Sequence, residues 1–220
     1  MRALYFEEHG GVDRLQIGDR PLPEPGPGEV RIRLRTAALN QLDLFVLQGM
    51  PGVEIGLPHI GGADGAGIVD SLGPGVEGVA VGDEVVYDPG LSCGGCEFCR
   101  KGEQSLCVRF GVVGEQGDGS FADAVVVPAA GVAPRPVHLS WEESAAFPLT
   151  YVTAWRMLFS RGGLRHSQVM GGGNLAKQKA ILMQTLGRFG NTVADGWGGA
   201  LLGEVADGMP ARGMLMKSAE

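Results

Sequence analysis

Apolar and polar side chains alternate strictly over residues 29–35, and a period of two predicts a β-strand. One face of this strand is aliphatic and the other is made of arginines, which we interpret as a solvated face without a specific function. A proline- and glycine-rich stretch, residues 21–28, predicts a rigid turn before the strand. The aliphatic positions are Val30, Ile32 and Leu34, and the basic positions are Arg31, Arg33 and Arg35.

Further short apolar segments are bounded by turn-forming and charged residues, as strands usually are. Gly73, Pro74, Gly75 and Gly78 break the chain between two of these segments. Short strands at such spacing predict a sandwich or a partly open barrel. The segments are residues 2–6, 15–18, 66–71, 83–88 and 121–127.

Helical signals follow the strand-rich part of the chain. Ser140 and Glu143 have the spacing of a capping box, in which the serine caps the first turn and the glutamate reaches back. The pattern predicts a helix from Trp141 to about Phe159, interrupted near Pro148.

Composition and charge narrow the class of protein. The 220 residues include 38 glycines, more than twice the usual share, and these stand between apolar segments as in a turn-rich β fold. A formal net charge of −7 disfavours nucleic acid as a partner. No apolar run reaches the ~18 residues of a membrane span, and acidic residues stand where a signal peptide needs its apolar stretch. We therefore expect a cytoplasmic protein with neither nucleic-acid nor membrane partners.

The four cysteines of the chain have the spacing of a metal site. Two residues lie between the first and second cysteines, two between the second and third, and seven between the third and fourth. Four thiolates complete a tetrahedral Zn²⁺ shell and leave no open position, which predicts structural rather than catalytic zinc. The stability of this lobe would then depend on the metal. The predicted ligands are Cys93, Cys96, Cys99 and Cys107.

Other uses of these cysteines fit less well. Disulfides are disfavoured because the chain is acidic and carries no secretion signal. In ferredoxins the fourth cysteine follows after three residues and precedes a proline, whereas here the gap is seven and Val108 follows. A zinc-ribbon nucleic-acid module fits the spacing, but the nearby basic residues are few: Arg100, Lys101 and Arg109.

Together with the cysteines, several motifs resemble the medium-chain dehydrogenase/reductase superfamily, which includes zinc-containing alcohol dehydrogenases and quinone reductases. The resemblance runs from about Met1 to Arg165. It implies a mixed fold of β with α, namely a GroES-like, partly open β-barrel over residues 1–160 with a zinc lobe at residues 90–109. The other motifs are residues 23–30, 37–43, 62–67, 81–85 and 145–155.

The resemblance does not extend to the catalytic zinc. Asn40 stands at the position of the first cysteine ligand, Ala63 at that of the histidine and Leu149 near that of the third ligand. None of the three is a good zinc ligand, and we do not count the nearby His59 as one. The resemblance therefore implies a subgroup that keeps the structural zinc only.

In that subgroup, polar residues would line the substrate cleft. Asn40 would bind a carbonyl or the nicotinamide ribose, and Thr153 would contact the nicotinamide ring. Asp43 and Asp64 are the other predicted catalytic positions, with the bracing of turns as their alternative role.

The family's second domain is a Rossmann fold that binds NAD(P), and residues 161–220 resemble a short or truncated, incomplete α/β counterpart. A glycine-rich loop after a short predicted strand at residues 168–170 fits the pattern in which backbone N–H groups at a helix N-terminus hold a pyrophosphate. A helix is predicted over residues 175–186, and an acidic residue follows where one would bind the adenine ribose. The predicted cofactor positions are Gly171, Gly173, Ala176 and Asp195.

Length weighs against a complete cofactor domain, because a doubly wound sheet needs two halves and this tail can supply one βαβ unit at most. Residues 196–220 predict no element. A lone unit leaves strand edges unpaired, which indicates a fragment, a rearranged gene or a partner that supplies the missing layer, and favours a homo-oligomer.

Two functions from different classes follow. The first is an NAD(P)-dependent oxidoreductase that moves hydride between nicotinamide and a small alcohol or carbonyl substrate, with Zn²⁺ in a structural role. The second is a catalytically inactive, zinc-stabilised GroES-like domain that acts as a remnant or an interaction module. The substrate, the choice between NAD and NADP, and the activity of this chain alone stay open.

Overall fold

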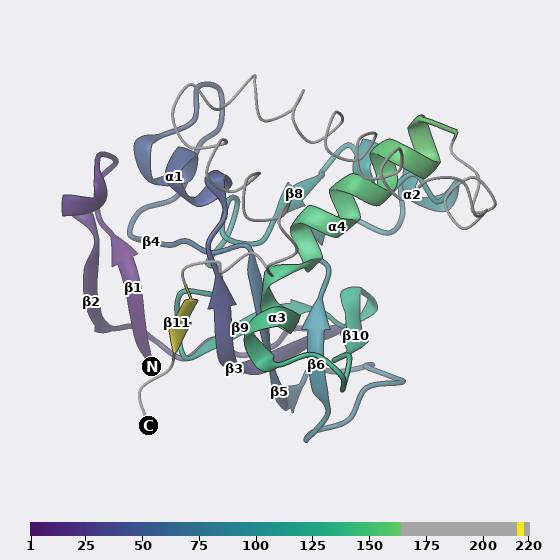
Figure 1. The fold of residues 1–220 in the computed structure, drawn as a ribbon, viewed down its shortest axis with the longest axis horizontal. Coiled ribbons are helices and arrows are strands. Elements are labelled where there is room, and N and C mark those ends of the chain that lie inside the picture. The colour runs from purple at the N-terminus through teal and green to yellow at the C-terminus, as the bar shows by residue number, and fades with distance from the viewer. Residues whose placement is uncertain (164–214, 218–220) are drawn as a thin grey trace, which may run out of the picture. The chain divides into compact units, whose positions relative to one another are not determined.

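Residues 1–163 and 215–217 are described in a computed structural model, in which strands and short helices alternate up to residue 134 and two further helices begin at Trp141 and Pro148 (Figure 1). One unit contains residues 1–149 and 215–217, and the described part of a second unit is residues 150–163. None of the described helices is long and apolar enough to cross a membrane. The strands are β1 (Arg2–Phe6), β2 (Gln16–Asp19), β3 (Glu29–Ala38), β4 (His59–Ile60), β5 (Asp64–Leu72), β6 (Glu84–Tyr87), β7 (Gly90–Leu91), β8 (Gly111–Val112), β9 (Ala124–Pro128), β10 (Val132–Pro134) and β11 (Leu215–Lys217). The helices are α1 (Gln41–Gln48), α2 (Glu97–Arg100), α3 (Trp141–Ala146) and α4 (Pro148–Trp155), which continues as a π-helical segment over Arg156–Arg161.

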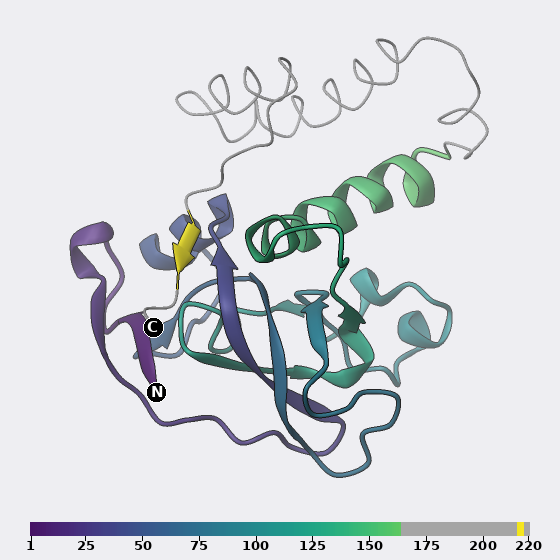
Figure 2. The same cartoon turned by 60° about the horizontal axis from the view of Figure 1, so that its bottom comes forward.

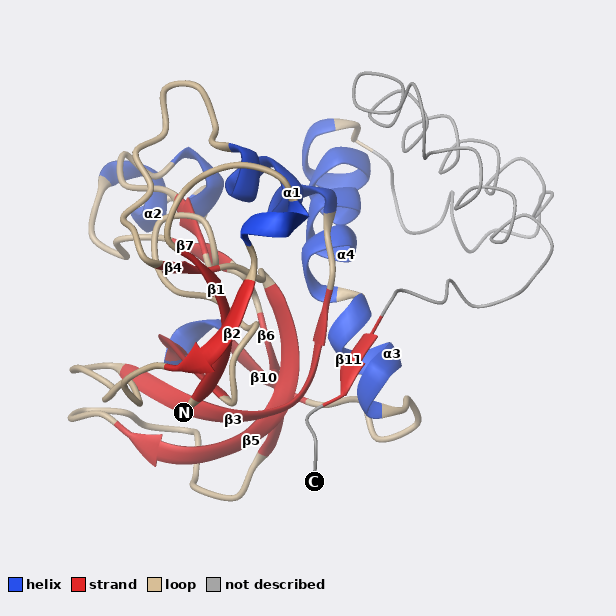
Figure 3. Cartoon of the chain, turned by 90° about the vertical axis from the view of Figure 1, so that its left-hand side faces the viewer, coloured by secondary structure: helices blue, strands red, loops and turns tan. Residues whose placement is uncertain are grey.

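The largest sheet of the first unit is antiparallel and centres on the long, curved strands β3 and β5 (Figure 3). β5 lies along one edge of β3, so β9 and β11 share the other edge, β9 at Glu29–Arg33 and β11 at Thr36–Ala38. Figure 2 shows β11, in yellow, beside the end of β3. β1, β2 and β4 form a second sheet, and β7 and β8 a third. The predicted mixed β and α fold is confirmed, with sheets that do not close into a barrel.

The aliphatic face of β3 forms the main core, as its alternation predicts. Val30 and Ile32 are fully buried and Leu34 nearly so. The strand continues beyond the alternating residues to Ala38, because the next three residues are buried as well and pair with β5 and β11. In the main core, Val30, Ile32 and Leu34 pack with six other buried residues: Val69, Val85, Tyr87, Val113, Val125 and Val127.

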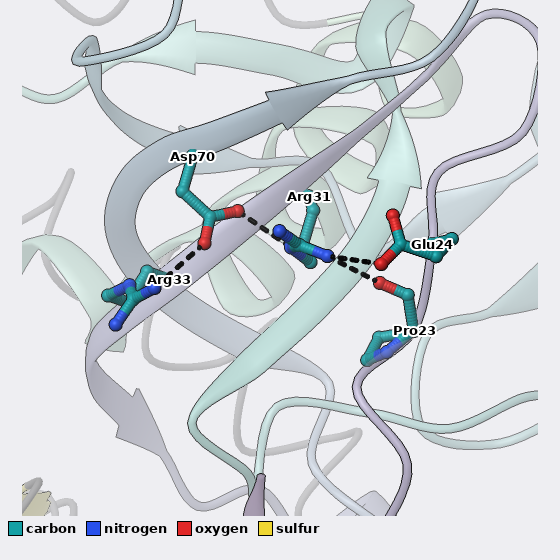
Figure 4. A network of polar contacts seen from close by, with 5 residues as sticks. All are labelled: Pro23, Glu24, Arg31, Arg33 and Asp70. Carbon is teal, nitrogen blue, oxygen red and sulfur yellow. Dashed lines mark hydrogen bonds and ion pairs between the residues drawn. The ribbon is translucent and has the colours of Figure 1, made fainter.

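The arginine face of β3 is more ordered than the alternation predicts. Only 12% of the Arg31 side chain is exposed, and its guanidinium donates to Oδ1 of Asp70 at 2.8 Å and to the carbonyl of Pro23 at 3.1 Å (Figure 4). Glu24 accepts a further bond from the same group, and Arg33 binds the second oxygen of Asp70. The interpretation as a solvated face was wrong for Arg31, because these acceptors take the place of water. It is correct for Arg33, whose side chain is 70% exposed.

Helix α3 begins with the predicted capping box. Oγ of Ser140 accepts the N–H of Glu143 at 3.1 Å, and the carboxylate of Glu143 accepts the N–H of Ser140 at 2.9 Å. Ala145 is fully buried against β3, β5 and β6. The predicted interruption is also confirmed, because α3 ends at Ala146 and α4 begins at Pro148.

The strands predicted within residues 1–127 are all present, with ends that differ by a few residues. The sequence does not predict β4, β7, β8, β10 or β11, because two or three residues are too few to show a period. The predicted helix over residues 175–186 and the strand before it lie outside the described residues.

Candidate functional site

The sulfur atoms of the four cysteines converge in one lobe of the first unit. All four Sγ atoms lie within 4.8 Å of one another, with 3.5 Å between those of Cys96 and Cys99 and 3.9 Å between those of Cys93 and Cys99. Four thiolates at a Zn–S distance of about 2.3 Å stand roughly 3.8 Å apart around a tetrahedral ion. The donor set and its spacing therefore fit one metal ion.

The backbone between β7 and β8 brings these ligands together. Gly94 has a φ of +68°, in the left-handed region that glycine adopts without strain. The N–H groups of Cys93 and Arg109 both donate to Sγ of Cys107 at 3.3 Å. These bonds orient the sulfur.

Metal binding requires thiolates, and backbone N–H groups of the lobe lower the pKa of two cysteines, Cys93 and Cys96. The backbone N–H groups of Gly95 and Cys96 lower the pKa of Cys93 to about 6. Burial raises the pKa of Cys99 to about 11, and side-chain hydrogen bonds with Cys96 and Cys107 add to this shift. A divalent cation at the centre would reverse this effect by supplying the missing positive charge.

A second polar cluster lies where the end of β3, the start of β5 and the start of α4 meet. The strand register places Asp64 opposite Ala38, two residues before Asn40. Nδ2 of Asn40 donates to Oδ2 of Asp64 at 3.1 Å, and the backbone N–H of Leu149 donates to Oδ1 at 3.0 Å. Because Asp64 is fully buried, a single carboxylate joins these three segments away from water.

Asp43, in the first turn of α1, braces the same region. Its Oδ2 accepts the backbone N–H of Asn40 at 2.6 Å, and the N–H groups of Gly62 and Ala63 also stabilise its charge. Its side chain is nearly buried. Burial raises the pKa of Asp43 to about 6 in spite of these N–H groups.

Burial also raises the pKa of Asp64, to about 7. The hydrogen bonds from Asn40 and Leu149 oppose this shift, and the negative charges of Asp43 and Asp88 add to it. Near neutral pH, Asp64 is therefore divided between its protonated and ionised forms.

Three of the four predicted catalytic residues come together in this cluster. Asn40 is half-buried and reaches the surface, whereas Asp43 and Asp64 lie beneath it. Thr153 is exposed on α4, in the second unit. The predicted cofactor positions lie outside the described residues: Gly171, Gly173, Ala176 and Asp195.

Two contacts of this cluster are not predicted from the sequence. Leu149 takes part through its backbone N–H, which no side-chain pattern reveals. Ser120 donates from Oγ to the carbonyl of Asp64 at 2.7 Å, and the sequence offers no signal for it. The alignment with the family could have indicated Leu149, because Leu149 stands near the position of one catalytic-zinc ligand and Asn40 stands at the position of another. Both contact the same carboxylate here.

Residues 26–137 match the family model of the alcohol dehydrogenase GroES-like domain, and the chain belongs to this family. A zinc-type alcohol dehydrogenase-like protein from Schizosaccharomyces pombe is 34% identical over 179 residues, which cover 80% of this chain and 48% of that protein. A crystal structure of an NAD-dependent alcohol dehydrogenase is 53% identical, with a TM-score of 0.72, over 75% of this chain and 48% of the other. A thermostable alcohol dehydrogenase from Pyrobaculum aerophilum is 37% identical, with a TM-score of 0.66, over 73% and 47%. The resemblance is confirmed, and the chain spans about half the length of the relatives it matches.

Proposed function

We propose that the chain is part of an NAD(P)-dependent oxidoreductase of the alcohol dehydrogenase type, which moves hydride between nicotinamide and a small alcohol or carbonyl substrate. The family match over residues 26–137 carries this proposal, and the similarity to an NAD-dependent alcohol dehydrogenase supports the choice of cofactor. We assign residues 1–160 to the GroES-like domain and residues 161–220 to a short nucleotide-binding segment. The pyrophosphate loop that begins at Gly171 stays a prediction.

The proposal includes one structural zinc ion, held by the four cysteines of the lobe. Four protein ligands leave no position for a substrate, so zinc would cross-link the lobe and take no part in the chemistry. The convergence of the four Sγ atoms within 4.8 Å supports this assignment.

Asn40 is the residue that we assign to the substrate oxygen. Asp64 takes one of the two N–H groups of its amide, so the second can donate to a carbonyl oxygen. A bound nicotinamide would supply hydride to the carbonyl carbon, and the amide of Asn40 would stabilise the negative charge that develops on the oxygen. Asp43 and Asp64 are buried and would act by holding Asn40, and we assign Thr153 to the nicotinamide ring.

Titration of NADH and NADPH into the full chain, followed by nicotinamide fluorescence, tests the proposal. We expect saturable binding by wild type and by N40A, because Asn40 is assigned to the substrate. Turnover with a panel of aldehydes, alcohols and quinones should fall about 10²-fold in N40A. If neither cofactor binds at millimolar concentration, the proposal is wrong for this chain.

A competing function is a zinc-stabilised domain without catalysis. The observation that favours it is the convergence of four cysteine sulfur atoms within 4.8 Å, because a zinc ion with four protein ligands stabilises a domain without catalysing a reaction. Cofactor-dependent turnover that is lost in N40A would exclude this alternative. Zinc binding without cofactor binding would support it.

A further inference from the structure

The two oxygens of Asp64 contact two different segments of the chain. Oδ2 accepts from the side chain of Asn40 and Oδ1 from the backbone of Leu149, the second residue of α4. We propose that Asp64 is a positioning residue, which holds the amide of Asn40 and the first turn of α4 in one arrangement so that a change at Asp64 reaches both. The proposal rests on the proposed function only where it assigns Asn40 to the substrate.

The start of α4 needs such a partner. The first N–H groups of a helix have no acceptor within the helix, and Pro148 has no N–H to satisfy. Leu149 is therefore the first residue of α4 with an N–H to donate, and a carboxylate at this end also interacts favourably with the helix dipole. Because Asp64 is fully buried, water cannot readily replace it, and its loss would remove the acceptor of both hydrogen bonds.

The hydrogen bond from Leu149 to Asp64 lies within the first unit, as does the bond from Asn40. Asp64 thus holds the start of α4 in place. The residue that we assign to the substrate depends on the same carboxylate.

The groups around Asp64 provide a way to perturb it without substitution. Asp43 from α1 and Asp88, which follows β6, are the charged groups that act on it, and Tyr87 is a further titratable neighbour. Burial raises the pKa of Asp64 to about 7, and the negative charges of its two acidic neighbours add to this shift. Both hydrogen-bonding partners of its side chain are donors, so a proton on the carboxyl group must weaken at least one of the two bonds.

An NMR titration of the full wild-type chain between about pH 5 and about pH 9 tests the proposal. We expect the side-chain amide of Asn40 and the backbone amide of Leu149 to shift with one common midpoint near 7. The amide of Val69, on the same strand but in the main core, should not follow that midpoint. Different midpoints for Asn40 and Leu149, or a shift of only one of them, would overturn the proposal.

Substitutions separate the two bonds. D64A removes both, so hydrogen exchange at Leu149 should become at least about tenfold faster. D64N keeps an oxygen acceptor for Leu149 but places a second amide against that of Asn40. Exchange at Leu149 should therefore change little, while the Asn40 signal shifts and the common titration disappears. Unchanged exchange at Leu149 in D64A would contradict the proposal.

D88N is the matched control, because it removes a neighbouring charge and leaves both Asp64 bonds in place. The common titration should remain, with a lower midpoint. If a variant fails to fold, the wild-type titration still decides the question. A chain that binds no nicotinamide would refute the proposed function and leave these shifts as expected, so the two proposals fail separately.

Discussion

The side-chain amide of Asn40 lies 3.1 Å from the carboxylate of Asp64, which joins a half-buried donor to a group that has no contact with solvent. An amide held from beneath in this way keeps a fixed direction, as a group that orients a substrate must. Asp43 fixes the backbone of Asn40 at the same time, through a 2.6 Å hydrogen bond from its N–H. The surface residue is thus held at both its backbone and its side chain by two buried aspartates.

We predict that the free energy of unfolding falls as the pH rises from about 4 to about 7. Burial raises the pKa of Asp43 to about 6 and that of Asp64 to about 7. At a pH below the pKa that an aspartate has in the unfolded chain, both the folded and the unfolded state hold the proton. At a pH between that unfolded-state pKa and the raised folded-state pKa, only the folded state holds it. Each group then removes about 1.4 kcal/mol of stability per pH unit until its folded-state pKa is passed.

Urea unfolding of wild type and D64N at several pH values measures this effect. D64N removes one of the two titrating groups, so its stability should fall less steeply, mainly at the upper end of the range. The same pH dependence in both proteins would show that Asp64 does not carry the proton.

We predict that the chain binds one zinc ion and that C107S loses it. The Sγ of Cys107 accepts two backbone N–H groups and lies within 4.8 Å of the other three sulfur atoms. Loss of the ion should abolish protection against hydrogen exchange in residues 90–112, because structural zinc contributes on the order of 10 kcal/mol to a small lobe. The main core around β3 and β5 should keep its protection.

Metal analysis and hydrogen exchange on purified protein check this prediction. S92A is a suitable control, since it changes a neighbour of Cys93 that is not a predicted ligand, and it should retain one zinc ion. Two zinc ions per wild-type chain, or full zinc content in C107S, would contradict the assignment.

Local patterns in the sequence predict much of the fold. The alternation over residues 29–35 identifies the core strand, and the spacing of Ser140 and Glu143 identifies the start of α3, because neighbouring residues determine both features. The role of Arg31 is not predicted, since its acceptors include Asp70, which is 39 residues away. A period of two separates the faces of a strand, but it does not reveal what covers each face.

The candidate site shows the same limit. The motifs identify Asn40 and Asp64, but the bond between Asp64 and the backbone of Leu149 spans 85 residues and involves no side chain of Leu149. β11 is a similar case, because its three residues pair with Thr36–Ala38 far away in the sequence. Main-chain contacts of this kind leave no pattern in the order of side chains.

We predict that R31A destabilises the first unit by about 1–3 kcal/mol and that R33A costs less than about 1 kcal/mol. Both arginines bind Asp70. Arg31 is largely buried, and it also donates hydrogen bonds to Pro23 and Glu24 in the turn at residues 21–28. Urea unfolding at constant pH measures the difference. Equal losses in the two variants would mean that exposure does not determine the strength of these pairs.

We predict that a chain ending at Gly213 exposes the edge of β3 at Thr36–Ala38. β11 pairs with this edge, and β9 covers only Glu29–Arg33, so removal of β11 leaves backbone N–H and C=O groups without their strand partner. Hydrogen exchange at Thr36–Ala38 should become faster, and the chain should associate as its concentration rises, because open strand edges pair with one another.

Exchange measurements and light scattering after gel filtration test this prediction. A chain shortened only by residues 218–220 is the control, since it keeps β11 and should behave like wild type. A synthetic peptide of residues 214–220, added to the shortened chain, should restore protection by adding a strand to the same edge. Unchanged exchange at Thr36–Ala38 would mean that β11 does not hold the end of β3, which lies two residues before Asn40.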